Sequence, residues 1–353
     1  MSNQLYVGFT TIPSRSNYIE KVISDLRVQT LLPDTIVIGV PKYSSREKVA
    51  YDVIKIQEDA IKASKTFTNP PNILVHILKE DYGPLCKLMG LLQSVPFGKG
   101  HLLVTIDDDQ HYDKHLLETL SKGSKEHTDS VVCLCGHTIG KLKLPGGKSI
   151  NGWGYRCSSF DNNSILKAFQ LQSGSQVDIV SGWCGVLYKR DMFPSNPIDN
   201  VLEAFRANDN LLHRNDDIYI SAWLSKLNVK CTIFSYEGTH HQTENAMGAI
   251  NPLKLSSQKS KIMGNLIHFR EWWQLISRME ERGYFQNESV VNIGELSNET
   301  SDIAGTFISS QYTRKGPASL PLNKSITLNT SLCVTGMVLC IAVGTYLFIK
   351  SRK

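Results

Sequence analysis

The sequence predicts an α/β domain, in which helices cover a sheet, followed by one C-terminal transmembrane helix. Between residues 5 and 236, strand-like and helix-like segments alternate, which is the pattern of a sheet flanked by helices. One short aliphatic run, residues 101–106, ends in three consecutive aspartates, and runs of this kind are typical of buried parallel strands. Residues 332–349 are uncharged and mostly apolar, near the lower length limit for crossing a bilayer.

Each element follows from its local pattern. β-branched and aliphatic runs predict strands at residues 5–9, 35–40, 73–78, 101–106, 131–135, 177–180, 185–188 and 229–234. Apolar residues at helical spacing predict helices at residues 17–28, 46–64, 84–92, 113–124, 216–227 and 262–282. Pro84 suits the first turn of its helix, the position that proline tolerates best. Residues 140–159 are rich in glycine and are expected to form a long loop.

Composition divides the chain into four parts. Residues 1–255 form the predicted main domain, 256–286 a helical extension, 287–330 a polar stalk and 331–350 a membrane anchor. The N-terminus lacks the basic start and long apolar region of a secretory signal, so the main domain is expected in the cytosol. Basic residues flank the anchor on both sides, so the positive-inside rule leaves the orientation open.

The length and charge of the chain bear on its size and on nucleic-acid binding. With 353 residues the chain is long enough for a substantial core. The net charge is only +5, and the lysines and arginines are spread along the chain rather than clustered. Nucleic-acid binding is therefore not expected.

The eight cysteines do not look like a disulfide framework. No C-x-x-C pair occurs, which argues against structural zinc. Cys133 and Cys135 are expected on one side of a strand, and Cys184 is isolated in the sequence. We therefore expect reduced, buried thiols.

Polar residues with useful chemistry follow the predicted strands, where open α/β sheets bind their ligands. Three adjacent carboxylates repel one another, and a divalent cation is the usual way to keep them ionised. The helix that starts at Pro84 offers free N–H groups to an anion. The polar groups are residues 10–15, residues 81–84 with Lys87, Asp107 to Asp109, Asp216 with Asp217, and His240 with His241.

This order resembles the GT-A fold glycosyltransferases, family 2-like members with a D-x-D motif that use nucleotide-sugar donors. The resemblance covers about two-thirds of the chain, from Leu5 to His241. It implies a Rossmann-like mixed sheet. The segments that carry it are Thr11-Ile12-Pro13-Ser14-Arg15, Asp81-Tyr82-Gly83-Pro84 with Lys87, Ile106-Asp107-Asp108-Asp109-Gln110-His111-Tyr112, Ser181-Gly182-Trp183-Cys184-Gly185-Val186 and Asn215-Asp216-Asp217-Ile218.

The resemblance implies roles for these residues. Asp109 would bind Mn²⁺ or Mg²⁺, and Asp107 would lean toward the donor ribose or the metal. His240 or His241 would complete the metal shell. The acidic pair Asp216 and Asp217 would hold the general base of an inverting enzyme. Trp183 and Gly182 would lie on the acceptor side, and the nucleotide pocket would be lined by Thr11, Pro13, Arg15, Asp81, Lys87, Asp107 and Asp108.

The expected function is metal-dependent transfer of a sugar from a UDP- or GDP-sugar to a hydroxyl of a glycan, protein or lipid. A sugar nucleotidyltransferase is one alternative, although residues 10–15 lack the glycine-rich loop of that class. A tail-anchored binding protein with a degenerate transferase fold is another. A retaining enzyme would share the D-x-D motif and use no general base.

Plainer interpretations of the same residues stay open. The aspartate triplet can be a solvated turn, and Asp216 or Asp217 can simply cap a helix. His240 and His241 can be an exposed loop pair. Lys87 and Arg15 can be surface cations, and Trp183 can be a packing residue that anchors a loop.

Overall fold

The computed structural model describes residues 3–143, 149–157, 174, 176–197, 215–234, 279 and 291–292. All of them belong to one unit, Met1–Gln311; the second unit, Tyr312–Lys353, lies outside the described residues. Nearly all of the predicted extension at 256–286 and stalk at 287–330, and all of the predicted anchor at 331–350, also lie outside them. Within the described ranges, no helix is both long enough and apolar enough to span a membrane.

The main sheet confirms a mixed α/β fold. Among the described residues it has eight strands, in the order β10-β13-β7-β12-β6-β1-β2-β5. The four strands from β5 to β6 are parallel, and β12 runs antiparallel to both of its neighbours, β6 and β7. The strands are β1 (Leu5–Phe9), β2 (Thr35–Pro41), β5 (Asn72–Leu78), β6 (Leu102–Thr105), β7 (Ser130–Cys133), β10 (Gln176–Val177), β12 (Val186–Lys189) and β13 (Lys230–Ile233).

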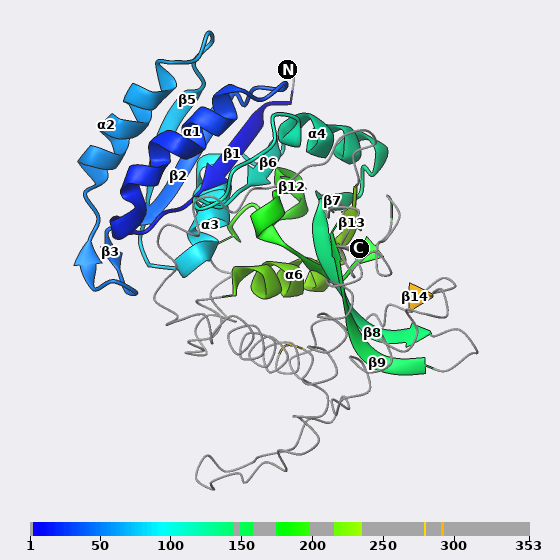
Figure 1. The fold of residues 1–353 in the computed structure, drawn as a ribbon. Helices are drawn as coiled ribbons and strands as arrows, with labels where there is room; N and C mark the ends of the chain where they lie inside the picture. The colour runs from blue at the N-terminus through cyan, green and yellow to red at the C-terminus, as the bar shows by residue number, and fades with distance from the viewer. Residues whose placement is uncertain are drawn as a thin grey trace, which may run out of the picture. The chain divides into compact units, whose positions relative to one another are not determined.

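Helices cover both faces of this sheet (Figure 1). One core joins α1 (Ile19–Arg27), α2 (Val53–Ser64) and α4 (Leu116–Glu126) to one face. The other core joins α3 (Cys86–Ser94) and α6 (Asp216–Lys226) to the opposite face. Because strand side chains alternate, successive residues enter different cores: Val104 packs with the first set of helices and Leu103 with the second.

The predicted helix at 46–64 is shorter in the structure and begins at Val53. A small hairpin, β3 (Tyr43–Ser44) with β4 (Val49–Ala50), occupies the chain before it. Asp52 caps the helix by accepting a hydrogen bond from the Lys55 N–H at 3.0 Å.

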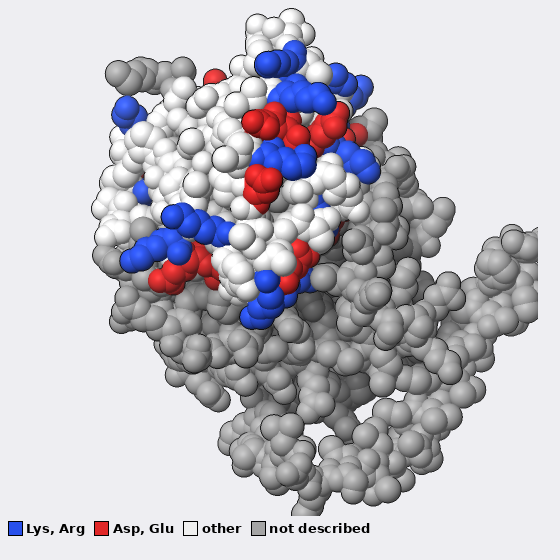
Figure 2. All heavy atoms as spheres, turned by 90° about the vertical axis from the view of Figure 1, so that its left-hand side faces the viewer, with Lys and Arg blue, Asp and Glu red and all other residues white. Residues whose placement is uncertain are grey.

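On the face shown in Figure 2, acidic and basic side chains of the described residues lie side by side, so this face carries no continuous basic surface.

The expected long loop at 140–159 is wrong. Strands β8 (Cys135–Lys143) and β9 (Ser149–Cys157) form an antiparallel hairpin in a second, four-stranded sheet. In that sheet β8 also pairs with β11 (Ile179–Val180) and with β14 (Val291–Asn292). Glycine is needed at Gly136, where a Cβ would lie 2.7 Å from the Ile179 carbonyl oxygen. Backbone pairing across the ladder therefore outweighs the low strand propensity of glycine.

Two predicted strands are each divided between the two sheets. Residues 131–135 become β7 and the start of β8, and residues 177–180 become parts of β10 and β11. As a result, Cys133 lies in one core and Cys135 in the other, so the expectation that they share one side of a strand is wrong.

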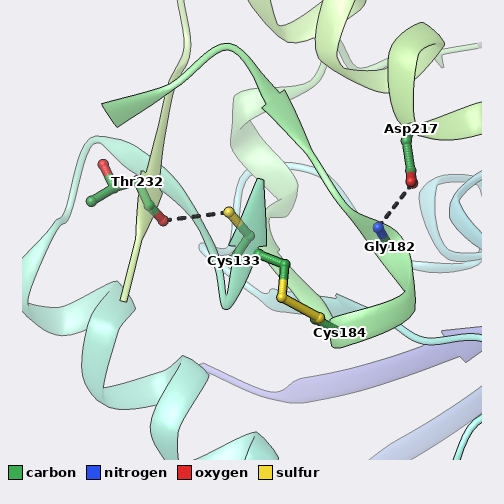
Figure 3. Close-up of a disulfide and its surroundings, with 6 residues drawn as sticks. Cys133, Gly182, Cys184, Asp217 and Thr232 are labelled. Atoms are coloured by element: carbon green, nitrogen blue, oxygen red, sulfur yellow. Dashed lines mark hydrogen bonds between the residues drawn. A yellow bond between two sulfur atoms is a disulfide. The ribbon is translucent and has the colours of Figure 1, made fainter. Parts of the chain in front are cut away.

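The expectation of reduced thiols also needs correction, because Cys135 and Cys184 form a disulfide with a Cα–Cα distance of 6.0 Å (Figure 3). Cys184 belongs to a 3₁₀ turn, η4 (Gly182–Cys184), which the fold brings beside the first residue of β8. The partners are 49 residues apart, and no sequence spacing marks them. Among the described cysteines, Cys86, Cys133 and Cys231 are free and buried, as expected.

Candidate functional site

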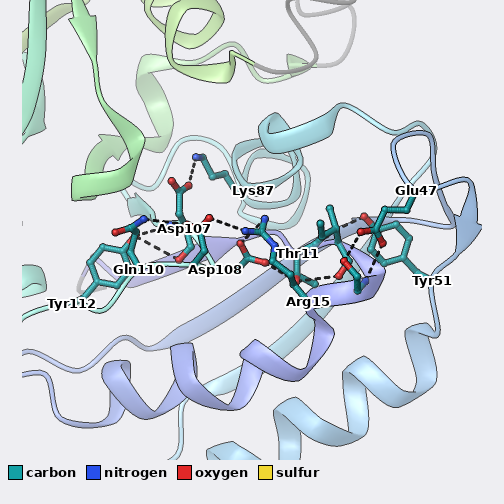
Figure 4. A network of polar contacts seen from close by, with 12 residues as sticks. Thr11, Arg15, Glu47, Tyr51, Lys87, Asp107, Asp108, Gln110 and Tyr112 are labelled. Atoms are coloured by element: carbon teal, nitrogen blue, oxygen red, sulfur yellow. Dashed lines mark hydrogen bonds and ion pairs between the residues drawn. The ribbon is translucent and has the colours of Figure 1, made fainter. Parts of the chain in front are cut away.

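The loops that follow β1 and β6 meet at the carboxyl edge of the sheet because these strands are parallel neighbours. The Thr11 hydroxyl donates to Asp108 Oδ2 at 2.7 Å. Arg15 lies against both Asp108 and Asp109, with N–O distances of 3.0 and 2.7 Å. Figure 4 shows Arg15 beside Asp108. The structure thus brings together four of the predicted donor-side and metal-site residues. Arg15 is not the plain surface cation of the alternative interpretation.

The three aspartates differ in exposure although they are consecutive. The Asp108 side chain is 4% exposed, whereas Asp107 and Asp109 are 28% and 29% exposed. Burial raises the pKa of Asp108 to about 7, against the opposing effects of Arg15 and Thr11. Asp108 therefore organises the loop from inside, and Asp107 and Asp109 are the carboxylates that remain within reach of a ligand.

Lys87 lies at the centre of a second cluster. It is in the first turn of α3, its side chain is 2% exposed, and Nζ is 2.6 Å from Asp107 Oδ1 and 2.7 Å from Asp216 Oδ2. Burial lowers the pKa of Lys87, but the carboxylates around it outweigh that effect and raise the pKa well above its usual value. The ammonium is therefore charged and bound to carboxylates. Lys87 is therefore not the solvated lysine of the plainer interpretation, and its contact with a nucleotide remains a prediction.

Asp216 and Asp217 occupy the first turn of α6 and face the same cluster. Asp217 Oδ1 accepts a hydrogen bond from the Gly182 N–H at 2.9 Å (Figure 3). The N-cap of α6 is Asn215, so neither Asp216 nor Asp217 occupies the capping position. Loss of hydration raises the pKa of Asp217 well above the ordinary aspartate value; Asp216 raises it further and Lys87 opposes this.

Gly182 lets the turn η4 approach the two charged side chains closely. A Cβ there would lie 2.9 Å from Asp217 Oδ1 and 2.9 Å from Lys87 Nζ. The neighbouring Trp183 is half-buried and packs against the core beneath α1 and α4. The two residues predicted for the acceptor side therefore do different things: one holds a carboxylate through its backbone, and the other anchors the turn.

Asp81 and Pro13 shape the loops around the predicted nucleotide pocket. Asp81 accepts hydrogen bonds from the backbone N–H groups of Ser45 (2.7 Å) and Gly83 (2.8 Å). Pro13 begins the 3₁₀ helix η1 (Pro13–Tyr18), a first-turn position that suits its fixed φ. Both residues lie at the sheet edge, and their contacts with a nucleotide remain predictions.

Two tyrosines complete the site and were given no role from the sequence. The Tyr51 hydroxyl donates to the Thr11 carbonyl at 2.9 Å, which ties the loop after β1 to the hairpin before α2. The Tyr112 hydroxyl accepts the Asp107 N–H at 2.7 Å and fixes the start of the aspartate triplet. No local signal marks either residue, because each acts through a backbone group that only the fold brings near.

The residues of the described part of the chain offer hard oxygen ligands, but no group of three or more His, Cys, Asp or Glu side chains close enough to hold a metal ion. Asp109 is the accessible carboxylate, and beside it Gln110 Oε1 is a buried oxygen without a hydrogen-bond partner. Such oxygens match Mg²⁺ or Mn²⁺. Arg15 now binds Asp109 Oδ2, so a metal would have to displace it. His240 and His241 lie outside the described residues.

No family model and no curated protein matches the chain. Solved structures of S. aureus TarS are similar to it over 78–79% of its length: TarS 1–349 alone (12% identity, TM-score 0.38), with UDP (15%, 0.36) and with UDP-GlcNAc (12%, 0.38). The matches span 64–65% of those chains. A similarity this distant carries no inference about activity, and the site is interpreted from its own geometry.

Proposed function

We propose that the chain is a glycosyltransferase that moves a sugar from a nucleoside diphosphate donor to a hydroxyl acceptor. One observation carries the proposal: Asp107, from the predicted donor side, and Asp216, from the predicted base position, both contact the buried ammonium of Lys87. A transferase needs charge control on the leaving group and a proton acceptor on the other reactant, held in fixed relation. This arrangement supports both needs at one edge of the sheet.

On the donor side, Asp107 and Asp109 are the accessible carboxylates and Arg15 is the nearest guanidinium. When bound, a Mn²⁺ or Mg²⁺ ion held by Asp109 and the Gln110 oxygen would supply positive charge against the leaving diphosphate. Arg15, released from Asp109, has the planar donor geometry that suits a phosphate group. Thr11 keeps Asp108 oriented and so holds the loop in place.

On the acceptor side, Asp217 is the proposed general base. Its carboxylate takes the proton of the acceptor hydroxyl as the new C–O bond to the sugar forms. The bond from the sugar carbon to the phosphate oxygen breaks, and the nucleoside diphosphate leaves with that electron pair. The raised pKa of Asp217 suits this role, because a base is most effective when its pKa lies nearer the working pH.

The test is a panel of UDP- and GDP-sugars with Mn²⁺, read out as released nucleoside diphosphate with and without hydroxyl acceptors. We expect release from at least one donor, and stabilisation of the protein by the matching nucleotide that depends on the metal. Preference for a nucleoside triphosphate would instead support a nucleotidyltransferase. No response to any nucleotide would support the non-catalytic binding protein.

The membrane anchor at 331–350 remains part of the proposal, with a glycan, protein or lipid as acceptor near that membrane. The disulfide bears on the orientation, because disulfides persist in oxidising compartments and are rare in the cytosol. We therefore place the main domain on the oxidising side rather than in the cytosol. Alkylation of cell-derived protein before and after reduction, followed by mass measurement, tests this: reduced Cys135 and Cys184 would restore the cytosolic assignment.

A further inference from the structure

We infer that Lys87 is the positioning residue that holds the donor-side carboxylate Asp107 and the acceptor-side carboxylate Asp216 in one rigid frame. The inference rests on the proposed function and deepens it, because it names what couples the two halves of the site. Lys87 touches neither reactant in this scheme. It acts through the carboxylates that it binds.

The geometry makes Lys87 a bridge between three segments. It extends from the first turn of α3, while Asp107 follows β6 and Asp216 begins α6. The Lys87 ammonium donates a hydrogen bond to Asp107 Oδ1 at 2.6 Å and forms an ion pair with Asp216 Oδ2 at 2.7 Å. Figure 4 shows the Asp107 contact, with Lys87 reaching the aspartate from the neighbouring helix. The cation therefore joins the segment after β6 to the start of α6.

The third side of the frame is the turn η4. A Cβ at Gly182 would lie 2.9 Å from both Lys87 Nζ and Asp217 Oδ1, and the Gly182 N–H holds that carboxylate. The proposed base is thus packed between this turn and the Lys87 cluster. A displacement of Lys87 would be transmitted to Asp217 through Asp216 and through Gly182.

Burial of the charge indicates that its role is not stability alone. Taking an ammonium and its carboxylate partners out of water is costly, and a well-packed apolar group often stabilises a fold equally well. Helix α3 already contributes apolar side chains to this core through Leu88, Met89 and Leu92, so the core does not need the Lys87 charge for packing. A buried lysine at this position is better explained by the carboxylates that it positions.

The experiment compares Lys87→Met with wild type in sugar transfer and in nucleotide binding. Methionine preserves much of the length of the side chain but removes the charge. We expect the kcat of transfer to fall on the order of 100-fold, the size of effect that a small misplacement of reacting groups produces. The KM for the donor should change by less than about tenfold, because Arg15, Thr11 and Asp109 keep their contacts.

A double variant separates positioning from simple charge balance. Lys87→Met leaves Asp216 without its cation, and adding Asp216→Asn removes that unpaired charge. We expect the double variant to regain thermal stability without regaining transfer. Recovery of both would show that Lys87 serves only to neutralise a buried carboxylate, and would overturn the inference.

Gly182→Ala tests the same frame while keeping every charge. The added methyl group must displace the Asp217 carboxylate and the Lys87 ammonium from their present positions, so transfer should fall at least about tenfold while the fold is retained. This variant decides the matter if Lys87→Met does not fold: unchanged transfer in Gly182→Ala would overturn the inference. Lys55→Met is the matched control, because Lys55 is an exposed helical lysine whose ion pair with Asp59 lies on α2; it should change nothing.

Different results would overturn the positioning role of Lys87 and the proposed glycosyltransferase function. A wild-type protein that transfers sugar, together with a Lys87→Met variant within about threefold of it, would overturn the positioning role and leave the glycosyltransferase. A wild-type protein that neither binds a nucleotide nor releases one from any donor would overturn the proposed function, and the positioning role with it.

Discussion

The site contains two cation–carboxylate clusters that differ in how firmly they are held. Around Arg15, the Arg15 side chain is 17% exposed, and its partners Asp108 and Asp109 are 4% and 29% exposed. Around Lys87, the Lys87 side chain is 2% exposed, and its partners Asp216 and Asp107 are 11% and 28% exposed, so the two clusters differ mainly in the burial of the cation. Exposed charges can exchange partners at little cost, whereas buried ones lose strong interactions when a partner moves. The Arg15 cluster is therefore suited to receive a ligand, and the Lys87 cluster to keep its shape.

The largest expected effect comes from the proposed base beside the Lys87 cluster. Asp217→Asn should lower transfer on the order of 10³-fold, because the amide accepts no proton while its shape is preserved. Nucleotide binding, measured by thermal stabilisation, should stay close to wild type. Asp59→Asn, at a partly exposed residue in α2, is the matched control. Retained turnover in Asp217→Asn would move the base to Asp216 or indicate a retaining mechanism.

A substitution in the Arg15 cluster should weaken nucleotide binding, which Asp217→Asn leaves close to wild type. Asp109→Ala should weaken metal-dependent nucleotide binding and reduce donor cleavage on the order of 10²-fold, the size expected when one electrostatic contact to a leaving group is lost. Titration calorimetry with UDP or GDP, with and without Mn²⁺, measures it. Asp129→Ala, at an exposed aspartate outside the site, should bind as wild type does. Equal metal-dependent binding in both variants would contradict the assignment of Asp109.

The dependence of transfer on pH tests the Lys87 cluster separately from the Arg15 cluster, because Asp217, whose pKa is raised, lies beside Lys87. Protonated Asp217 cannot act as a base, so kcat/KM should rise as pH rises through its folded-state pKa. The groups that face it are Asp216, Lys87, Asp107 and the Gly182 N–H. The acidic limb should lie above the ordinary aspartate value of about 4 and be absent in Asp217→Asn. A limb at the ordinary value would count against Asp217.

The smallest expected effect on the chemistry comes from the disulfide that tethers η4. Replacing Cys135 and Cys184 by serine should lower the free energy of unfolding by about 2–4 kcal/mol, the usual effect of opening a loop of this length. Urea denaturation measures the change. Transfer should fall only modestly, because the Gly182 N–H still reaches Asp217 in the folded state. Cys231→Ser, at a free buried thiol, is the control, and equal stability of the two variants would contradict a structural role for the disulfide.

Much of the fold follows from local patterns. The aliphatic runs at 5–9, 35–40 and 101–106 become adjacent parallel strands, because each carries enough apolar surface to be buried on both faces. The sequence does not mark the hairpin β8–β9, since glycine-rich strands show little of the period-two alternation that is typical of a half-buried strand. The two strands pair through backbone hydrogen bonds, which place few requirements on the side chains.

By itself, the sequence determined which chemical groups arrive at the carboxyl edge: a guanidinium after the first strand, a lysine in a helix start, three consecutive aspartates and a second acidic pair. These follow from strand order and loop position alone. Only the tertiary structure decided that Lys87 joins Asp107 to Asp216, that Arg15 takes Asp108 and Asp109, and that Cys135 meets Cys184. Ion pairs and disulfides depend on distances of a few ångströms between groups far apart in the chain, and those distances are set by packing.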